Sequence, residues 1–166
     1  MIVNTDACYS YGIKTHNIWL DLDSIEDLPE SLAGGYILLV YLAEKQVIEV
    51  GKLAGILFPK GFYAYVGSAM SGIKSRLRRH FASEKNFHWH VDYLVERANA
   101  ISALIIPGEM RAECILAYAL SSRFASFHGF GSSDCRCSSH LFFSTNERQL
   151  KEGIRAVVEY SKDIHV

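Results

Sequence analysis

This sequence contains few prolines, a net charge close to zero and no long apolar run. Three prolines among 166 residues, 49% of them hydrophobic, and no repeat or low-complexity run fit one compact globular domain. The longest apolar run, residues 36–43, is far too short to cross a bilayer. The N-terminal residues include neither the basic nor the apolar segment that directs secretion. We therefore expect a soluble, cytoplasmic protein without a membrane partner, whose cysteines are reduced thiols.

The near-zero net charge of −1 argues against a general nucleic-acid coat, but the charge is unevenly distributed. Residues 21–30 contain five acidic residues and no base, whereas residues 74–80 contain four lysines and arginines and no acid. The local field decides where a polyanion binds. The basic run is therefore either a nucleic-acid surface or a solvated helix face.

Hydrophobic periodicity predicts strands first and helices interleaved after them, which indicates an α/β (α+β) domain. We expect strands at 17–22, 36–42, 47–50, 62–66, 100–106 and 141–144, with a hairpin turn at 43–46. We expect helices at 73–83, 90–97, 110–124 and 147–160. Residues 1–33 are predicted to be an N-terminal extension, 34–145 the main domain, and 146–166 a helix packed on it.

Arg76 and His80 lie four residues apart, so they share a helix face, and both border the apolar stripe. A guanidinium held near the sheet can bind a phosphate through two hydrogen bonds and stabilise charge in a transition state. The alternative is a surface arginine packed along its aliphatic stem. Lys74 and Arg78 form a second, more exposed pair; with Arg79 they are candidate nucleic-acid-binding cations.

Glu113 is predicted to face the apolar side of its helix, because Leu116, Ala117 and Leu120 follow it at helical spacing. Desolvation of a carboxylate there is costly unless it is paired or bound to a cation. Two interpretations stay open: an ion pair with an arginine from another element, or a ligand of Mg²⁺ or Mn²⁺.

Tyr36 and Tyr65 are ordinary strand aromatics by propensity. Beside a metal-bound water, either phenol could instead accept a proton as a general base whose pKa is lowered by Arg76 and the ion. Tyr63 shares the face of Tyr65 and competes for this role.

These pieces together resemble the GIY-YIG nuclease superfamily. The likeness rests on Gly34-Gly35-Tyr36, Tyr65-Val66-Gly67, Arg76 and Glu113, and covers residues 34–144. Residues 62–69, 89–94, 113–114 and 129–135 are similar to one branch of it. That branch has long been described as a domain of unknown function and also occurs fused to endonuclease III-like glycosylases.

The resemblance implies a GIY-YIG-like small central sheet of three antiparallel strands flanked by helices, with an extra hairpin inserted at 44–61 and a C-terminal helix. It implies an endonuclease that uses Mg²⁺ or Mn²⁺ to hydrolyse phosphodiester bonds in DNA during repair or processing. The implied site residues are the two motif tyrosines Tyr36 and Tyr65, the phosphate-binding Arg76, the metal ligand Glu113 and His80, which is similar to a histidine of restriction-type members. Ser68, directly after the second motif, is a further candidate nucleic-acid-binding residue.

The asparagine that follows the metal-binding glutamate in many members has no obvious counterpart, and Asp134 is the nearest polar candidate. His90 is a further candidate ligand. Cys135, Cys137 and His140, with His128 upstream, could contribute to a zinc site. Their C-x-C spacing is not the usual C-x-x-C, which favours an ordinary polar loop.

Two rival functions therefore stay open beside the nuclease. One is a non-catalytic nucleic-acid-binding module of the same fold. The other is a small zinc-binding or redox protein centred on residues 135–140.

Overall fold

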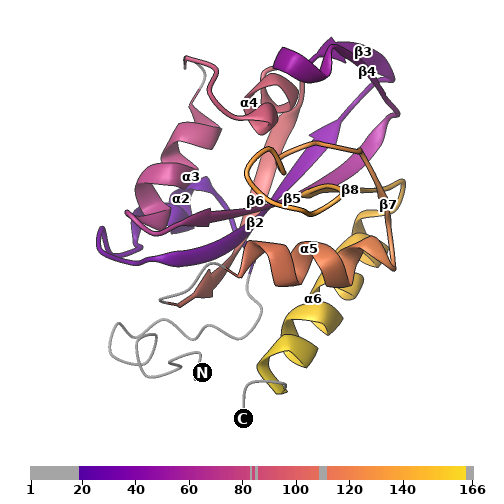
Figure 1. The fold of residues 1–166 in the computed structure, drawn as a ribbon. Helices are drawn as coiled ribbons and strands as arrows, with labels where there is room; N and C mark the ends of the chain where they lie inside the picture. Colours follow the sequence, from indigo (N-terminus) through magenta and orange to yellow (C-terminus); the bar gives the residue numbers. More distant parts are fainter. Residues whose placement is uncertain (1–18, 83, 85, 109–111, 164–166) are drawn as a thin grey trace.

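A six-stranded antiparallel sheet forms the centre of the computed structural model, which describes residues 19–82, 84, 86–108 and 112–163 (Figure 1). The strand order is β1-β6-β2-β5-β8-β7. The strands of this sheet are β1 (Trp19–Leu20), β2 (Gly34–Leu42), β5 (Gly61–Ala69), β6 (Asn99–Pro107), β7 (Ala125–Ser126) and β8 (Leu141–Ser144). The helices are α2 (Leu22–Glu26), α3 (Ile73–Phe81), α4 (His90–Val95), α5 (Glu113–Ser121) and α6 (Glu147–Asp163).

This architecture confirms the predicted α/β (α+β) class, with a central antiparallel sheet, flanking helices and a C-terminal helix. The sheet is larger than the resemblance implied. Its three long strands, β6, β2 and β5, are joined by β1 at one edge and by β8 and β7 at the other. Among the described residues, no helix is long and apolar enough to cross a membrane.

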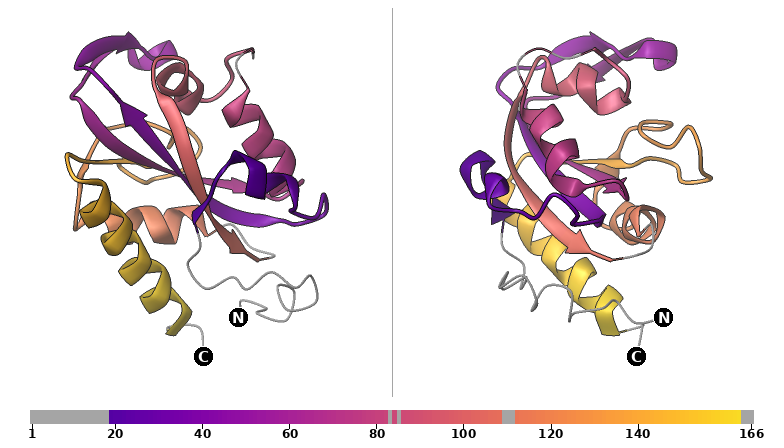
Figure 2. Two further views of the ribbon diagram at one scale, coloured as in Figure 1. Left: turned by 180° about the vertical axis from the view of Figure 1, so that it is seen from behind. Right: turned by 90° about the vertical axis from the view of Figure 1, so that its left-hand side faces the viewer.

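Each face of the sheet has its own hydrophobic layer, because side chains of a strand alternate between the two faces. On β2, Tyr36 and Leu38 point into the layer that includes α3 and α4, whereas Ile37 and Leu39 point into the layer that includes α5 and α6. Figure 2 shows these two groups of helices on opposite sides of the sheet. The central strands are thus covered on both faces, which accounts for their nearly continuous apolar sequence.

The expected pairing of the first two strands is wrong. Strand β3 (Gln46–Glu49) does not pair with β2; it pairs with β4 (Gly55–Phe58) in a separate two-stranded sheet. A short 3-10 turn, η1 (Gly51–Leu53), joins the two strands, and the hairpin lies at one end of the molecule (Figure 1). Both edges of β2 are already occupied, by β5 and β6, so no edge is left for β3. The segment 44–61 is therefore an inserted hairpin.

The expected N-terminal extension lies outside the described residues from 1 to 18. From residue 19 onward it contributes to the first layer, where Ile25, Leu28 and Leu32 are buried. At the other end, α6 packs Leu150 and Ile154 into the second layer, as its periodicity predicted. The segments at both ends of the described chain therefore pack on the central sheet.

Candidate functional site

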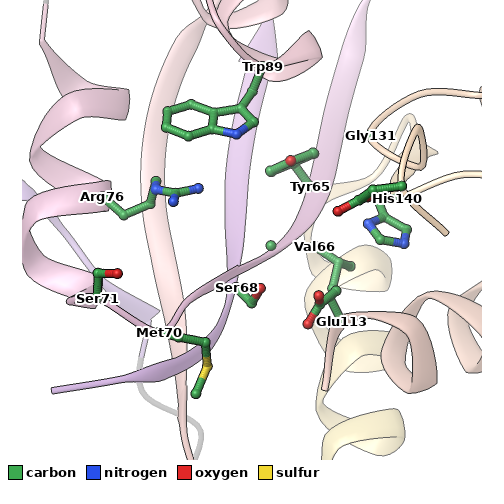
Figure 3. Close-up of a pocket in the computed structure, with 12 residues that line it drawn as sticks. Tyr65, Val66, Ser68, Met70, Ser71, Arg76, Trp89, Glu113, Gly131 and His140 are labelled. Atoms are coloured by element: carbon green, nitrogen blue, oxygen red, sulfur yellow. The ribbon is translucent and has the colours of Figure 1, made fainter. Parts of the chain in front are cut away.

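A cavity of about 250 Å³ lies beside the end of β5, between α3 and α5 (Figure 3). Arg76 reaches into it from α3, and Glu113 reaches in from the first turn of α5 on the opposite side (Figure 3). Four more residues of the predicted site line it: Tyr65, Ser68, Asp134 and His140. The fold therefore brings together residues that are up to 75 positions apart in the sequence.

Trp89 holds the Arg76 guanidinium by stacking. The Arg76 Cζ atom lies 3.9 Å from the centroid of the Trp89 ring, and that of Arg79 lies 4.6 Å from it. Stacking on an aromatic face fixes a guanidinium without using its N–H donors. The guanidinium also interacts with the Tyr36 phenol, and its remaining donors can bind an anion. Trp89 is not among the site residues predicted from the sequence, because no local spacing links it to Arg76.

The Glu113 carboxylate is buried at one of its oxygens. Among the described residues, Oε2 has no hydrogen-bond partner, and no lysine, arginine or histidine forms an ion pair with Glu113. Of the two interpretations of Glu113, the ion pair with an arginine is therefore not found in the described part of the chain. A buried carboxylate oxygen without a partner is costly, and a bound cation would compensate it.

Tyr36 and His80 are joined by a buried hydrogen bond of 2.7 Å between the phenol oxygen and Nε2. The other ring nitrogen, Nδ1, lies 3.8 Å from Oδ1 of the fully buried Asp92. Oδ2 of Asp92 accepts hydrogen bonds from Arg79 Nη2 at 2.6 Å and from the backbone N–H groups of His88 and Trp89. Asp92 is not among the site residues predicted from the sequence, and its position points to orienting His80.

The glycine of the second motif makes room for the tyrosine of the first. Tyr36 and Gly67 are opposite each other in the β2–β5 ladder. A Cβ atom at Gly67 would lie only 2.6 Å from Cζ and from the hydroxyl of Tyr36. The two short motifs are therefore one packing unit, which the sequence alone did not reveal.

Burial raises the pKa of Tyr36 and of Tyr65 well above the ordinary value of 10.0. The positive charge of Arg76 acts in the opposite direction on both phenols but is outweighed. Arg76 therefore acts in the expected direction, but without a metal ion burial outweighs it and neither phenol pKa is lowered overall. Both tyrosines keep their protons at neutral pH.

The basic run is largely paired with acidic side chains. Lys74 lies 3.2 Å from Glu30, and Arg78 binds Glu26 and Glu30 of the acidic segment. Arg79 is engaged with Asp92, as described above. The lining of the cavity does not include any of these three cations. Arg76 is the member of the run that reaches the cavity.

Next to the cavity, Cys114, Cys135, Cys137 and His140 form a group that could hold a metal ion. One ligand atom from each of the four lies within 4.8 Å of every other. Burial, together with the neighbouring thiols, raises the pKa of Cys137 to about 12. Sequence spacing pointed to the three loop residues but missed Cys114, which lies on α5. His128 is not part of the group.

His90 has a structural contact instead of a ligand role among the described residues. Its Nδ1 accepts a hydrogen bond of 3.0 Å from the backbone N–H of Gly131. Burial lowers its pKa from the ordinary value of 6.5, which favours the neutral ring that this acceptor role requires. His90 thus anchors the loop that carries Asp134 to the start of α4.

Comparison with known proteins gives one family. No curated protein and no solved structure matches the chain significantly. The model of the family described as "Domain of unknown function DUF123" matches residues 35–162. The match spans most of the chain and includes every residue that lines the cavity. The chain therefore belongs to this DUF123 family.

Proposed function

We propose that the chain is a metal-dependent endonuclease-like domain of the GIY-YIG type that hydrolyses phosphodiester bonds in DNA, in repair or processing. One observation carries the proposal: a fixed guanidinium, Arg76, and a buried carboxylate oxygen without a hydrogen-bond partner among the described residues, on Glu113, line the same cavity. Phosphodiester hydrolysis needs a cation that holds the phosphate and an acid that holds a metal ion.

The donor set fits Mg²⁺ or Mn²⁺ on the cavity side of Glu113. Mg²⁺ in proteins is usually bound by one or two carboxylates, and substrate phosphates and waters complete its shell. Glu113 would supply the first carboxylate, and Asp134, which lines the same cavity, is placed to supply a second. Such an ion would polarise the phosphate and lower the pKa of the attacking water.

Arg76 would bind the non-bridging oxygens of the scissile phosphate. Its guanidinium is planar and stays charged at any working pH, and the Trp89 ring holds its plane in position. Negative charge builds on those oxygens as water attacks, so a donor that is already oriented stabilises the transition state more than the ground state. Trp89 is thus a positioning residue for Arg76.

Tyr36, His80 and Asp92 are buried and are not part of the cavity lining, and this chain of groups would receive the proton of the attacking water. With a proton on Nδ1, which lies 3.8 Å from Asp92 Oδ1, Nε2 of His80 would accept from the Tyr36 hydroxyl. Tyr36 can then take up a proton while it passes its own to His80. This relay does not require a lowered phenol pKa, which agrees with the raised pKa of Tyr36.

Tyr65 keeps its proton and would donate a hydrogen bond to the bound phosphate from the wall of the cavity. Ser68 would contact the adjoining DNA backbone from the same strand. Lys74, Arg78 and Arg79 share their charge with acidic partners, so we assign them a long-range attraction for DNA and no direct contact with the scissile phosphate.

The test is cleavage of labelled linear, nicked, flap and four-way-junction DNA with Mg²⁺ or Mn²⁺, by the wild type and by Glu113→Gln. The glutamine keeps the size of the side chain and removes its charge. The matched control is Glu147→Gln, which makes the same change in the first turn of α6, outside the cavity. We expect metal-dependent products from the wild type and the control, and none from Glu113→Gln.

Equal cleavage by Glu113→Gln and the wild type would remove Glu113 from the mechanism. If the folded wild type cleaves none of the four substrates, the proposal fails for DNA. Binding that weakens steeply with salt, without cleavage, would then identify the non-catalytic nucleic-acid-binding module.

A further inference from the structure

Three thiols and an imidazole from two distant segments meet beside the cavity, and the proposed hydrolysis uses none of the thiols. Cys114 is the second residue of α5. Cys135, Cys137 and His140 belong to the loop between β7 and β8, which we call the 127–140 loop. The described cysteines are free thiols, so no disulfide accounts for their proximity.

The four ligand atoms already lie close to the geometry of a tetrahedral zinc site. Two sulfurs at the usual Zn–S bond length of about 2.3 Å are separated by about 3.8 Å in a tetrahedron. Cys135 Sγ lies 3.4 Å from His140 Nε2, and the largest separation within the group is at most 4.8 Å. Side-chain shifts of about 1 Å or less would complete the shell, so no backbone rearrangement is needed.

We propose that Cys114, Cys135, Cys137 and His140 bind one Zn²⁺ as a structural site that fastens the 127–140 loop to the first turn of α5. Three thiolates and one imidazole are ligands for zinc, whereas carboxylate and water oxygens suit Mg²⁺ and Mn²⁺. Four protein ligands also leave no open position for a substrate or water, which is typical of a structural site.

The zinc would join a helix start without a side-chain cap to a loop without regular secondary structure. At the start of α5, Ala112 provides no side-chain cap for the helix. The 127–140 loop contains no strand or helix; its backbone is held by hydrogen bonds such as Gly129 N–H to Ser138 O and His140 N–H to Phe130 O. A zinc ion would connect this loop to α5 and would hold Glu113, the residue before Cys114, at the cavity.

The first experiment measures the zinc content of tag-free protein purified under reducing conditions. We expect about one zinc per chain in the wild type, and a loss of most of it in Cys114→Ser and in Cys137→Ser. The matched control is Cys8→Ser, the same change at a cysteine outside the described residues, which should retain the zinc. Glu113→Gln should also retain it, so zinc binding is tested separately from cleavage.

A second experiment needs only the wild type, in case the serine variants do not fold. Alkylation followed by peptide mass spectrometry compares the protein with and without a zinc chelator. We expect Cys114, Cys135 and Cys137 to react only after chelation, whereas the reactivity of Cys8 should not depend on the chelator. Backbone hydrogen exchange should rise after chelation in residues 112–117 and in the 127–140 loop, while α6 stays protected.

Three outcomes would overturn the proposal. The first is a folded, reduced wild type that neither carries zinc nor takes it up when zinc is added. The second is equal alkylation of Cys114, Cys135 and Cys137 with and without chelator. The third is full zinc content in folded Cys114→Ser and Cys137→Ser. None of these results bears on cleavage, so this inference can fail while the proposed function stands.

Discussion

Replacing Arg76 by alanine should remove most of the cleavage and leave the fold intact. The loss of transition-state stabilisation is large relative to the reaction rate, whereas the loss of the stack on Trp89 is small relative to the stability of the domain. A preorganised group that stabilises transition-state charge is worth a factor of about 10² or more in rate, or roughly 2.7 kcal/mol. In the folded protein, the Arg76 guanidinium is held by its stack on Trp89 at 3.9 Å. Such a stack contributes about 0.5–2 kcal/mol.

Even the upper value leaves the domain folded, since single domains of this size are stable by about 5–15 kcal/mol. The assay pairs the single-turnover cleavage rate of the best substrate with the thermal unfolding midpoint. Arg76→Lys should fall between the wild type and Arg76→Ala, because it keeps the charge but loses the planar stack and the paired donors. The control is Arg97→Ala, an exposed arginine that does not line the cavity.

Cleavage by Arg76→Ala at the wild-type rate would refute the assignment of Arg76 as the phosphate-binding group. A loss of the same size in Arg97→Ala would also refute it, because the effect would then reflect charge in general. If Arg76→Ala unfolds at room temperature, the estimate that the stack contributes little to stability is wrong.

Two further predictions concern the packing of the site. Gly67→Ala should lower the free energy of unfolding by about 1–3 kcal/mol, because its Cβ would lie 2.6 Å from the Tyr36 hydroxyl. Urea unfolding measures this change. The control is Gly108→Ala, whose Cβ would meet nothing within 4 Å and which should change the stability little. For His90, the folded state lowers the pKa from 6.5, so the unfolded state binds more protons as the pH falls through that value. The free energy of unfolding should therefore drop on acidification from about pH 7.5 to 5.5. His90→Asn, which can still accept from Gly131 but cannot titrate, should show a smaller drop, and an identical drop would contradict the assignment.

Much of the fold could be predicted from the sequence because the central strands and helices have clear hydrophobic periodicity and are separated by turn-forming residues. Strand β8 has the expected bounds, and β2, β5, α3 and α6 lie within a few residues of theirs. Pairing was harder to predict. The turn-like residues 43–46 favoured a hairpin between β2 and β3, but β2 buries both faces and both edges, and only distant strands supply those partners. Local turn chemistry carries no information about which edge is free.

Some residues of the candidate site could likewise be predicted from the sequence, and others could not. Arg76 and Glu113 were predictable because each is a charged residue beside an apolar helical stripe. Burial of a charge in such a position is costly unless the side chain has a partner or a ligand. Trp89, Asp92 and Cys114 were not predictable as partners of Arg76, His80 and Cys135. Each of these contacts joins segments that are packed together only by the sheet, so sequence spacing does not encode it.

The glycines of the two motifs permit close packing at the end of the sheet next to the cavity. A Cβ atom at Gly34 would lie 2.4 Å from the carbonyl oxygen of Ile106, so this pairing position opposite Pro107 of β6 has no room for a side chain. At Gly67 the missing side chain leaves space that the Tyr36 ring occupies. The ring then reaches His80 through its hydroxyl, and Gly67 itself lines the cavity. A larger residue at Gly67 would therefore displace the Tyr36 ring from His80, and one at Gly34 would push β6 away from β2, although neither change removes a functional group.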